Sequence, residues 1–170
     1  MNEVNIDRFD SMLSFADSGT RAGVLVACLK EATPEEGNLL LQHWFNLCDA
    51  LRPWQDDLRE EFHRVGWVAD TDQELEMPCR VYRGAWHDDE VEHALSWTLD
   101  IEVAQKFCRI ISGPRGWFLG TKRDDAIPTV FQGICTSALG YLNERHEHEV
   151  IVDVVEDIEP IQQLLPAPTQ

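Results

Sequence analysis

The chain has 170 residues, 44% of them hydrophobic, so it is long enough to bury one ordinary domain core without metal or disulfide staples. Its 14 basic and 31 acidic residues give a formal net charge of -17, which disfavours nucleic acid and favours a protein partner with a basic surface, although solubility alone would explain the same charge. The longest apolar run is too short to cross a membrane, so no membrane partner is expected.

The cysteines favour a reducing compartment. The chain has five of them, at Cys28, Cys48, Cys79, Cys108 and Cys135, and they are odd in number, far apart in sequence and without a C-x-x-C pair. No signal-like apolar segment follows a basic N-terminus. We therefore expect a cytoplasmic protein with neither a disulfide framework nor a reactive thiolate.

Residues 1–66 are predicted to form a helical layer. Apolar side chains recur at helical spacing between Ile6 and Ala16, and the dense apolar stretch at 24–29 predicts a second, well-buried helix. Both patterns require a partner surface to cover their apolar faces.

Two further helices are predicted in this layer. Thr33, followed by a proline and by Glu36, is typical of a helix start with a capping box, and the apolar face that begins at Leu40 continues to Leu51. A last apolar stripe runs from 54 to 65, where the following glycine favours a stop.

The rest of the chain is mostly strand-like. Residues 70–76 are acidic and without periodicity, which predicts a loop. Asp100 is placed to cap a helix whose face includes Ala104 and Cys108. Strands are predicted at 79–84, 95–99, 117–121, 129–135 and 149–155. The sequence thus predicts a single α+β domain over 1–170, with helices first and a β-rich core at 79–155.

Two carboxylates stand at the entrance of the last predicted strand. Glu147 and Glu149 would share one face of an extended chain, and carboxylates that close raise each other's pKa. A charged strand edge that resists aggregation is the alternative interpretation of the same pair.

Three short motifs occur in an informative order. Tyr82-Arg83-Gly84 closes one predicted strand, Ser96-Trp97-Thr98 opens another, and Glu147-His148-Glu149 leads into an aliphatic strand. Over residues 79 to 155 this order resembles the arginine-specific mono-ADP-ribosyltransferases, the group that includes cholera-like and clostridial binary toxins and phage-encoded enzymes. The resemblance implies a mixed or antiparallel split β-sandwich with an NAD cleft. It also implies NAD as substrate and no metal.

The resemblance implies a role for each cofactor-binding residue. Arg83 would hold the NAD phosphates, and the backbone of Gly84 would meet the nicotinamide amide where the absent Cβ permits close approach. Ser96 would brace the nicotinamide-ribose pocket, Thr98 would hold the strand, and Tyr82 would complete the cofactor site. A surface salt bridge at Arg83 and a strand-edge hydroxyl at Ser96 are the structural alternatives.

The two glutamates are the predicted catalytic residues. Glu149 would bond the ribose 2'-hydroxyl and stabilise the cation that develops as nicotinamide leaves. Glu147 would orient or deprotonate the acceptor, which the resemblance implies is an arginine side chain. Tyr141, expected in the preceding loop, would recognise the target or else anchor the loop as a core residue.

Other residues are weaker candidates. Trp97, Trp117 and Phe118 have the chemistry to stack on nicotinamide, but core packing is the favoured interpretation for each of them. The histidines beside the two glutamates, together with His87 and His93, lack ligand spacing, so no metal site is predicted.

The middle motif departs from the Ser-Thr-Ser of many related toxins, which leaves the second pocket hydroxyl unassigned. We expect a protein made inside a bacterium, for example by a phage that modifies its host. Two other functions fit the same residues: a non-catalytic acidic binding or inhibitor protein, and an NAD glycohydrolase that uses water as acceptor.

Overall fold

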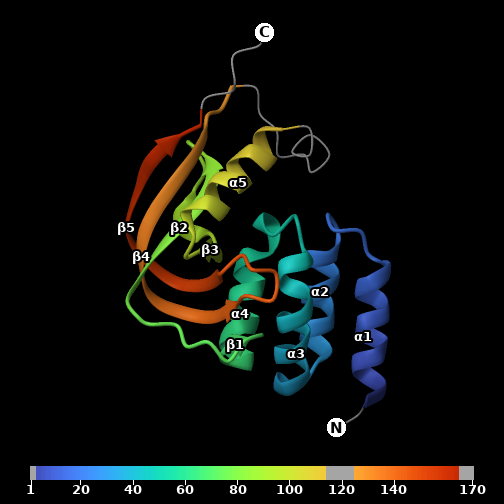
Figure 1. Cartoon of the computed structure of the whole chain (residues 1–170). Coiled ribbons are helices and arrows are strands. Elements are labelled where there is room, and N and C mark those ends of the chain that lie inside the picture. Colours follow the sequence, from blue (N-terminus) through green and yellow to red (C-terminus); the bar gives the residue numbers. More distant parts are fainter. Residues whose placement is uncertain (1–2, 114–124, 165–170) are drawn as a thin grey trace.

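The computed structural model describes residues 3–113 and 125–164 (Figure 1). These residues form five α-helices and one five-stranded mixed sheet, which confirms the mixed helix and strand content predicted from the sequence. The strand predicted at 117–121, with Trp117 and Phe118, lies outside the described residues. Within the described ranges, no helix combines the length and the apolar character needed to cross a membrane.

The helical layer contains four α-helices. They are α1 (Glu3–Phe15), α2 (Arg21–Glu31), α3 (Pro34–Trp44) and α4 (Gln55–Val65). The predicted capping box is present at the start of α3, where the Thr33 side chain accepts from Glu36 N at 3.2 Å and the Glu36 carboxylate accepts from Thr33 N at 2.9 Å. Two backbone donors that helix formation leaves without partners are thereby satisfied.

The third helix is shorter than predicted. The helical face was expected to continue to Leu51, but α3 ends at Trp44 and two 3-10 turns follow, η1 (Phe45–Leu47) and η2 (Arg52–Trp54). Cys48 is extended, with φ -99 and ψ 123, so the chain leaves the helix there. The apolar spacing continues past the helix because Leu47 and Leu51 still pack against the same core cluster, although neither lies in α3.

The sheet is built around one long hairpin. Its strands are β1 (Val68–Ala69), β2 (Cys79–Trp86), β3 (Ser96–Thr98), β4 (Pro128–Leu142) and β5 (Glu149–Gln163). The sheet order is β1-β4-β2-β3-β5, and β4 also pairs with β5, so the pairings of β2, β4, β5 and β3 close into a ring. The pairing of β1 with β4 is parallel and the others are antiparallel.

The two hairpin strands are longer than predicted. Each has 15 residues, whereas the sequence pattern predicted strands only at 129–135 and 149–155. Their pairing contains several register shifts, one of them between Ala138 and Gly140. Such bulges break the alternation of apolar and polar side chains while the backbone pairing continues, and for that reason the pattern underestimates the length.

The remaining elements are a short 3-10 turn, η3 (Val91–His93), and the helix α5 (Ile101–Ser112). Asp100 caps α5 as predicted, because its carboxylate accepts from Glu102 N at 2.8 Å. The helix α5 packs against β2 and β4, and Figure 1 shows it away from the four N-terminal helices.

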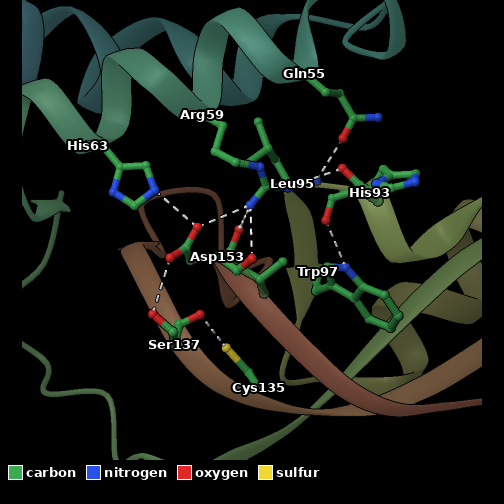
Figure 2. A network of polar contacts seen from close by, with 11 residues as sticks. Gln55, Arg59, His63, His93, Leu95, Trp97, Cys135, Ser137 and Asp153 are labelled. Carbon is green, nitrogen blue, oxygen red and sulfur yellow. Dashed lines mark hydrogen bonds and ion pairs between the residues drawn. The ribbon is translucent and has the colours of Figure 1, made fainter.

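The helical layer and the sheet share a core. Leu95, Leu139 and Ile151 of the β-rich part belong to the same buried cluster as the apolar faces of the N-terminal helices. Polar contacts add to this core, as Figure 2 shows: Arg59 of α4 donates to the Val152 and Asp153 carbonyls at 3.2 and 3.0 Å. The helices therefore hold the strand that begins at Glu149 by both packing and hydrogen bonds.

Candidate functional site

Three neighbouring strands bring the central motif residues together. Tyr82 of β2 is in register with Thr98 of β3, and Thr98 is in register with Glu149 of β5. A guanidinium nitrogen of Arg83 donates to the Ser96 carbonyl, and the Ser96 hydroxyl donates to Glu149 Oε1 at 2.5 Å. Arg83, Ser96 and Glu149 thus form one continuous polar cluster, although 66 positions separate its ends in the sequence.

Glu149 is a buried carboxyl group with one unused acceptor. Glu149 is 9% exposed, and its Oε2 has no hydrogen-bond partner among the described residues. Burial raises the pKa of Glu149 to about 7. The hydrogen bond from Ser96 opposes this rise, the negative charge of Glu147 adds to it, and the positive charge of Arg83 opposes it. A buried acceptor without a partner destabilises the fold, so this carboxyl group is a candidate for a functional role.

Arg83 supplies positive charge beside that carboxyl group. Burial lowers the pKa of Arg83, and the negative charges of Asp89 and Glu149 oppose this effect. Since a guanidinium remains protonated in proteins, the cluster holds a fixed cation that can pair with an anionic ligand.

Glu147 does not occupy the expected position. It was predicted to share a strand face with Glu149, but β5 begins at Glu149 and Glu147 lies in the bend before it. His148, between them, has a left-handed backbone with φ 46, which interrupts the alternation of an extended chain. The predicted side-by-side geometry is therefore wrong, but the charge of Glu147 still raises the pKa of Glu149.

The loop at 143–148 is fixed from several sides. The Thr98 hydroxyl donates to the Glu147 carbonyl at 2.6 Å, and the Asp70 carboxylate accepts from Asn143 N at 2.7 Å. The Asn143 side chain accepts from His148 N at 3.2 Å. Sequence reasoning missed both residues. Asn143 could have been found from the tendency of asparagine side chains to bond nearby backbone in turns, but no local pattern signals Asp70, whose backbone partners are Asn143 and Glu144.

Tyr141 lies in the core. It was expected in a loop that could meet a target, but it belongs to β4 and is 0% exposed. Its hydroxyl and His148 Nδ1 are 2.9 Å apart. A fully buried ring cannot contact a partner protein, so target recognition by Tyr141 is wrong and the alternative, a core residue that anchors the loop, fits.

Gly84 is a glycine for a different reason from the one expected. A Cβ there would lie 2.3 Å from the Ala104 carbonyl oxygen and 2.9 Å from Cys108 N, so α5 fills the space that was assigned to nicotinamide. The missing Cβ permits close packing of α5 on β2. A backbone contact between Gly84 and a ligand stays a prediction.

A shallow cavity adjoins the cluster. Its volume is about 350 Å³ and it is lined by Tyr82, Leu99, Asp100, Ile101 and His148. Tyr82 and His148 are the sequence neighbours of Arg83 and Glu149, but the two charged residues do not line the cavity themselves. Tyr82 also packs against the apolar cluster beneath α5.

The helical layer borders the site from the other side. Arg145, in the loop before Glu149, donates to the Asn46 carbonyl of η1 at 2.9 Å. Burial raises the pKa of Cys48 to about 12, and Glu149 is among the charges that add to this rise. The segment after α3 therefore forms one wall beside Glu149, a role that the apolar pattern did not reveal.

No cluster of three or more His, Cys, Asp or Glu side chains suited to a metal ion occurs within residues 3–113 and 125–164. His148 is engaged by Tyr141, and His87 Nδ1 accepts from Ile127 N at 3.0 Å. The polar cluster itself supplies a buried carboxyl group, a hydroxyl and a guanidinium.

No protein-family model matches the chain, and neither the curated proteins nor the solved structures contain a match. Relatives therefore assign neither a family nor a function.

Proposed function

We propose that this protein is a mono-ADP-ribosyltransferase, which transfers ADP-ribose from NAD to an arginine side chain of another protein and releases nicotinamide. The strands that carry the site would then correspond to the split β-sandwich of that family. The bacterial, cytoplasmic setting expected from the sequence belongs to the same proposal.

The observation that carries the proposal is the unpartnered Oε2 of Glu149. The other oxygen of that carboxyl group is engaged by Ser96, and Arg83 contacts the same serine through its carbonyl. A buried acceptor with no partner fits a ligand hydroxyl, as the ribose 2'-hydroxyl of NAD would be. The resemblance assigns this task to Glu149, and the orphan oxygen supports it independently of the family.

The chemistry follows from the charges. In NAD the bond between the ribose and nicotinamide breaks heterolytically: its electron pair leaves with nicotinamide, and positive charge develops on the ribose. An ionised carboxylate held at Glu149 stabilises that charge more in the transition state than in the ground state. Arg83 would pair with the pyrophosphate, for which a planar guanidinium is well suited.

Acceptor activation falls to Glu147. The incoming nitrogen of a guanidinium must be aligned and lose a proton, and a carboxylate at the edge of the site serves both needs. Glu147 is only partly buried, whereas Glu149 is 9% exposed, so the outer glutamate is the more accessible to a protein acceptor. The net charge of -17 supports a partner with a basic surface around its arginine.

The proposal requires the site to open. The cavity beside it is lined by Tyr82 and His148, whereas Glu149 is buried, Arg83 is partly buried, and neither of them lines the cavity. NAD would therefore displace part of the loop at 143–148 or of η1 when it binds. The Thr98 hydroxyl holds the loop to β3 and Arg145 holds it to η1, and both contacts can exchange for contacts with a ligand.

A non-catalytic acidic binding protein is the second candidate, and the net charge of -17 favours it. Thermal unfolding with and without NAD separates the two functions. A ligand that binds only the native state raises the melting temperature, so NAD should stabilise the enzyme and leave the binding protein unchanged.

The decisive experiment combines the protein with NAD labelled in the adenylate part and a bacterial lysate. Label incorporated into a protein band, with nicotinamide released in equal amount, is the expected result. Nicotinamide release without incorporation would indicate an NAD glycohydrolase instead. The absence of both, together with no thermal stabilisation by NAD, would refute the proposal.

A further inference from the structure

Two cysteines that are distant in the sequence are neighbours in the sheet. Cys79 begins β2 and Cys135 lies in β4, and the two residues are directly in register in the antiparallel β2–β4 pairing. The Cys79 thiol donates to Met77 Sδ at 3.6 Å and the Cys135 thiol donates to the Ser137 carbonyl at 3.3 Å, and the two thiols are near enough for each to shift the pKa of the other. All five cysteines are free thiols in the structure, but the strand register places these two side by side, which their spacing along the sequence did not predict.

We propose that Cys79 and Cys135 are a modification site, at which a reversible cross-strand disulfide forms by exchange with a small disulfide such as glutathione disulfide.

The geometry suits this bond. Residues directly opposite each other on antiparallel strands have Cα atoms about 4.5 or 5.5 Å apart, and disulfides span about 4.4 to 6.8 Å between Cα atoms. The register therefore allows the bond to form by side-chain rotation, without movement of the strands. Cys28 in α2, Cys48 after η1 and Cys108 in α5 belong to other elements, so the register selects one pair among the five cysteines.

Exposure sets the order of the two exchange steps. Cys79 is half-buried and Cys135 is 0% exposed. The Cys79 thiolate attacks one sulfur of glutathione disulfide, and the first glutathione leaves as a thiolate. Cys135 then loses its proton to solvent and attacks Cys79 Sγ, which displaces the second glutathione. Two protein thiols are thereby oxidised to one disulfide, and glutathione disulfide is reduced to two glutathione molecules.

Thiol acidity makes this exchange dependent on pH. Burial raises the pKa of both thiols, that of Cys135 to about 12, where Cys79 and the carboxylate of Asp153 add to the rise. The thiolate fraction is therefore small at neutral pH, and disulfide formation accelerates as the pH rises towards these values.

The disulfide would alter a network that links the sheet to the helical layer. The Cys135 thiol donates to the Ser137 carbonyl at 3.3 Å, and the Ser137 hydroxyl donates to Asp153 at 3.4 Å. Figure 2 shows that Asp153 also meets Arg59 and His63 of α4. Oxidation removes the S–H donor at one end of this chain of contacts, so its effect reaches the helix that holds β5.

The test equilibrates the reduced, full-length protein with glutathione buffers of increasing oxidised fraction, in the presence of a metal chelator. Acid quenching, alkylation of free thiols and peptide mapping by mass spectrometry then report each cysteine. We expect a Cys79–Cys135 crosslinked peptide with Cys28, Cys48 and Cys108 alkylated. The same crosslink should be absent in urea at the same glutathione ratio, because the unfolded chain loses the register.

Two variants test the order of exchange. Cys135→Ser should accumulate a mixed disulfide between glutathione and Cys79, since the resolving thiol is absent. Cys28→Ser, a matched change in α2, should still form the crosslink, with circular dichroism as the check on folding. Glutathione on Cys79 of the wild-type protein without a crosslink, a crosslink through another cysteine, or equal crosslinking in urea would each overturn the proposal.

Discussion

Buried carboxylates in the two halves of the molecule have different surroundings. In the helical layer, Glu36 is 4% exposed and closes the capping box with Thr33, and Glu61 is 8% exposed and accepts from Arg64 at 2.7 Å. In the sheet, Glu149 is 9% exposed, and one of its oxygens has no partner among the described residues.

The difference separates structural from functional charge. Burying a carboxylate is costly unless hydrogen bonds or a counter-charge offset the lost solvation, and the two helical glutamates meet that condition within their own helices. Glu149 meets it only in part, so folding alone does not explain the residue. An incompletely paired buried acid is the arrangement expected where a ligand completes the set of partners.

The largest expected effect concerns catalysis at the incompletely paired site. Glu149→Gln removes the charge that would face the developing cation, so both ADP-ribosyl transfer and NAD hydrolysis should fall by roughly a hundredfold to a thousandfold. Nicotinamide release and label incorporation measure the two reactions.

A matched control for this change is Glu156→Gln, on the exposed part of the same strand. It alters charge and shape in the same way and should leave both reactions intact. Equal losses in the two variants would show that the site tolerates no change in β5 charge, and the contrast between the two carboxylates would fail.

Glu149→Gln should stabilise the folded protein at alkaline pH, although it impairs catalysis. The pKa of Glu149 is about 7 in the folded protein and 4.5 for the ordinary group, so the fold disfavours the ionised form. Below pH 4.5 the carboxyl group is protonated in both states and does not change the free energy of unfolding. Between pH 4.5 and 7 the free energy of unfolding falls, and above pH 7 the full loss of about 3 kcal/mol applies. Glu149→Gln should therefore be more stable than wild type at pH 8 and equal to it at pH 4.5, as urea unfolding at both pH values can measure.

A third prediction separates the two glutamates of the site. Glu147→Gln keeps the charge at Glu149 but removes the group that prepares the acceptor, so transfer to arginine should fall by about a hundredfold while slow nicotinamide release survives. Parallel assays of the two reactions test this division. Loss of both reactions to the same extent would place Glu147 and Glu149 in one shared role.

The helical layer was predictable because its signals are local. The capping box at Thr33 and the stop at Gly66, which has φ 82, follow from side chains and backbone preferences within one turn of each helix. The exception is the end of α3, where the apolar spacing continued although the chain had already left the helix.

The site was predictable only in outline. The sequence named Arg83, Ser96 and Glu149, but their contact depends on a ring of strand pairings that no local pattern encodes. It misplaced Glu147, because a left-handed backbone at a histidine leaves no periodic trace. It also missed the Cys79–Cys135 pair. Strand register places these two residues opposite each other, and spacing along the chain does not reveal that register.

The smallest expected effect lies in the helical layer. Glu61→Gln weakens the contact with Arg64, whose guanidinium also donates to the Leu29 and Ala32 carbonyls and so keeps other partners. Since 34% of the Arg64 side chain is exposed to solvent, the loss should be limited to about 1 to 2 kcal/mol. Urea unfolding at pH 8 should thus show destabilisation here and stabilisation for Glu149→Gln, with transfer activity unchanged in the Glu61 variant. If both variants shift stability in the same direction, the two carboxylates differ in surroundings but not in energetic role, and the orphan oxygen of Glu149 loses its value as a marker of function.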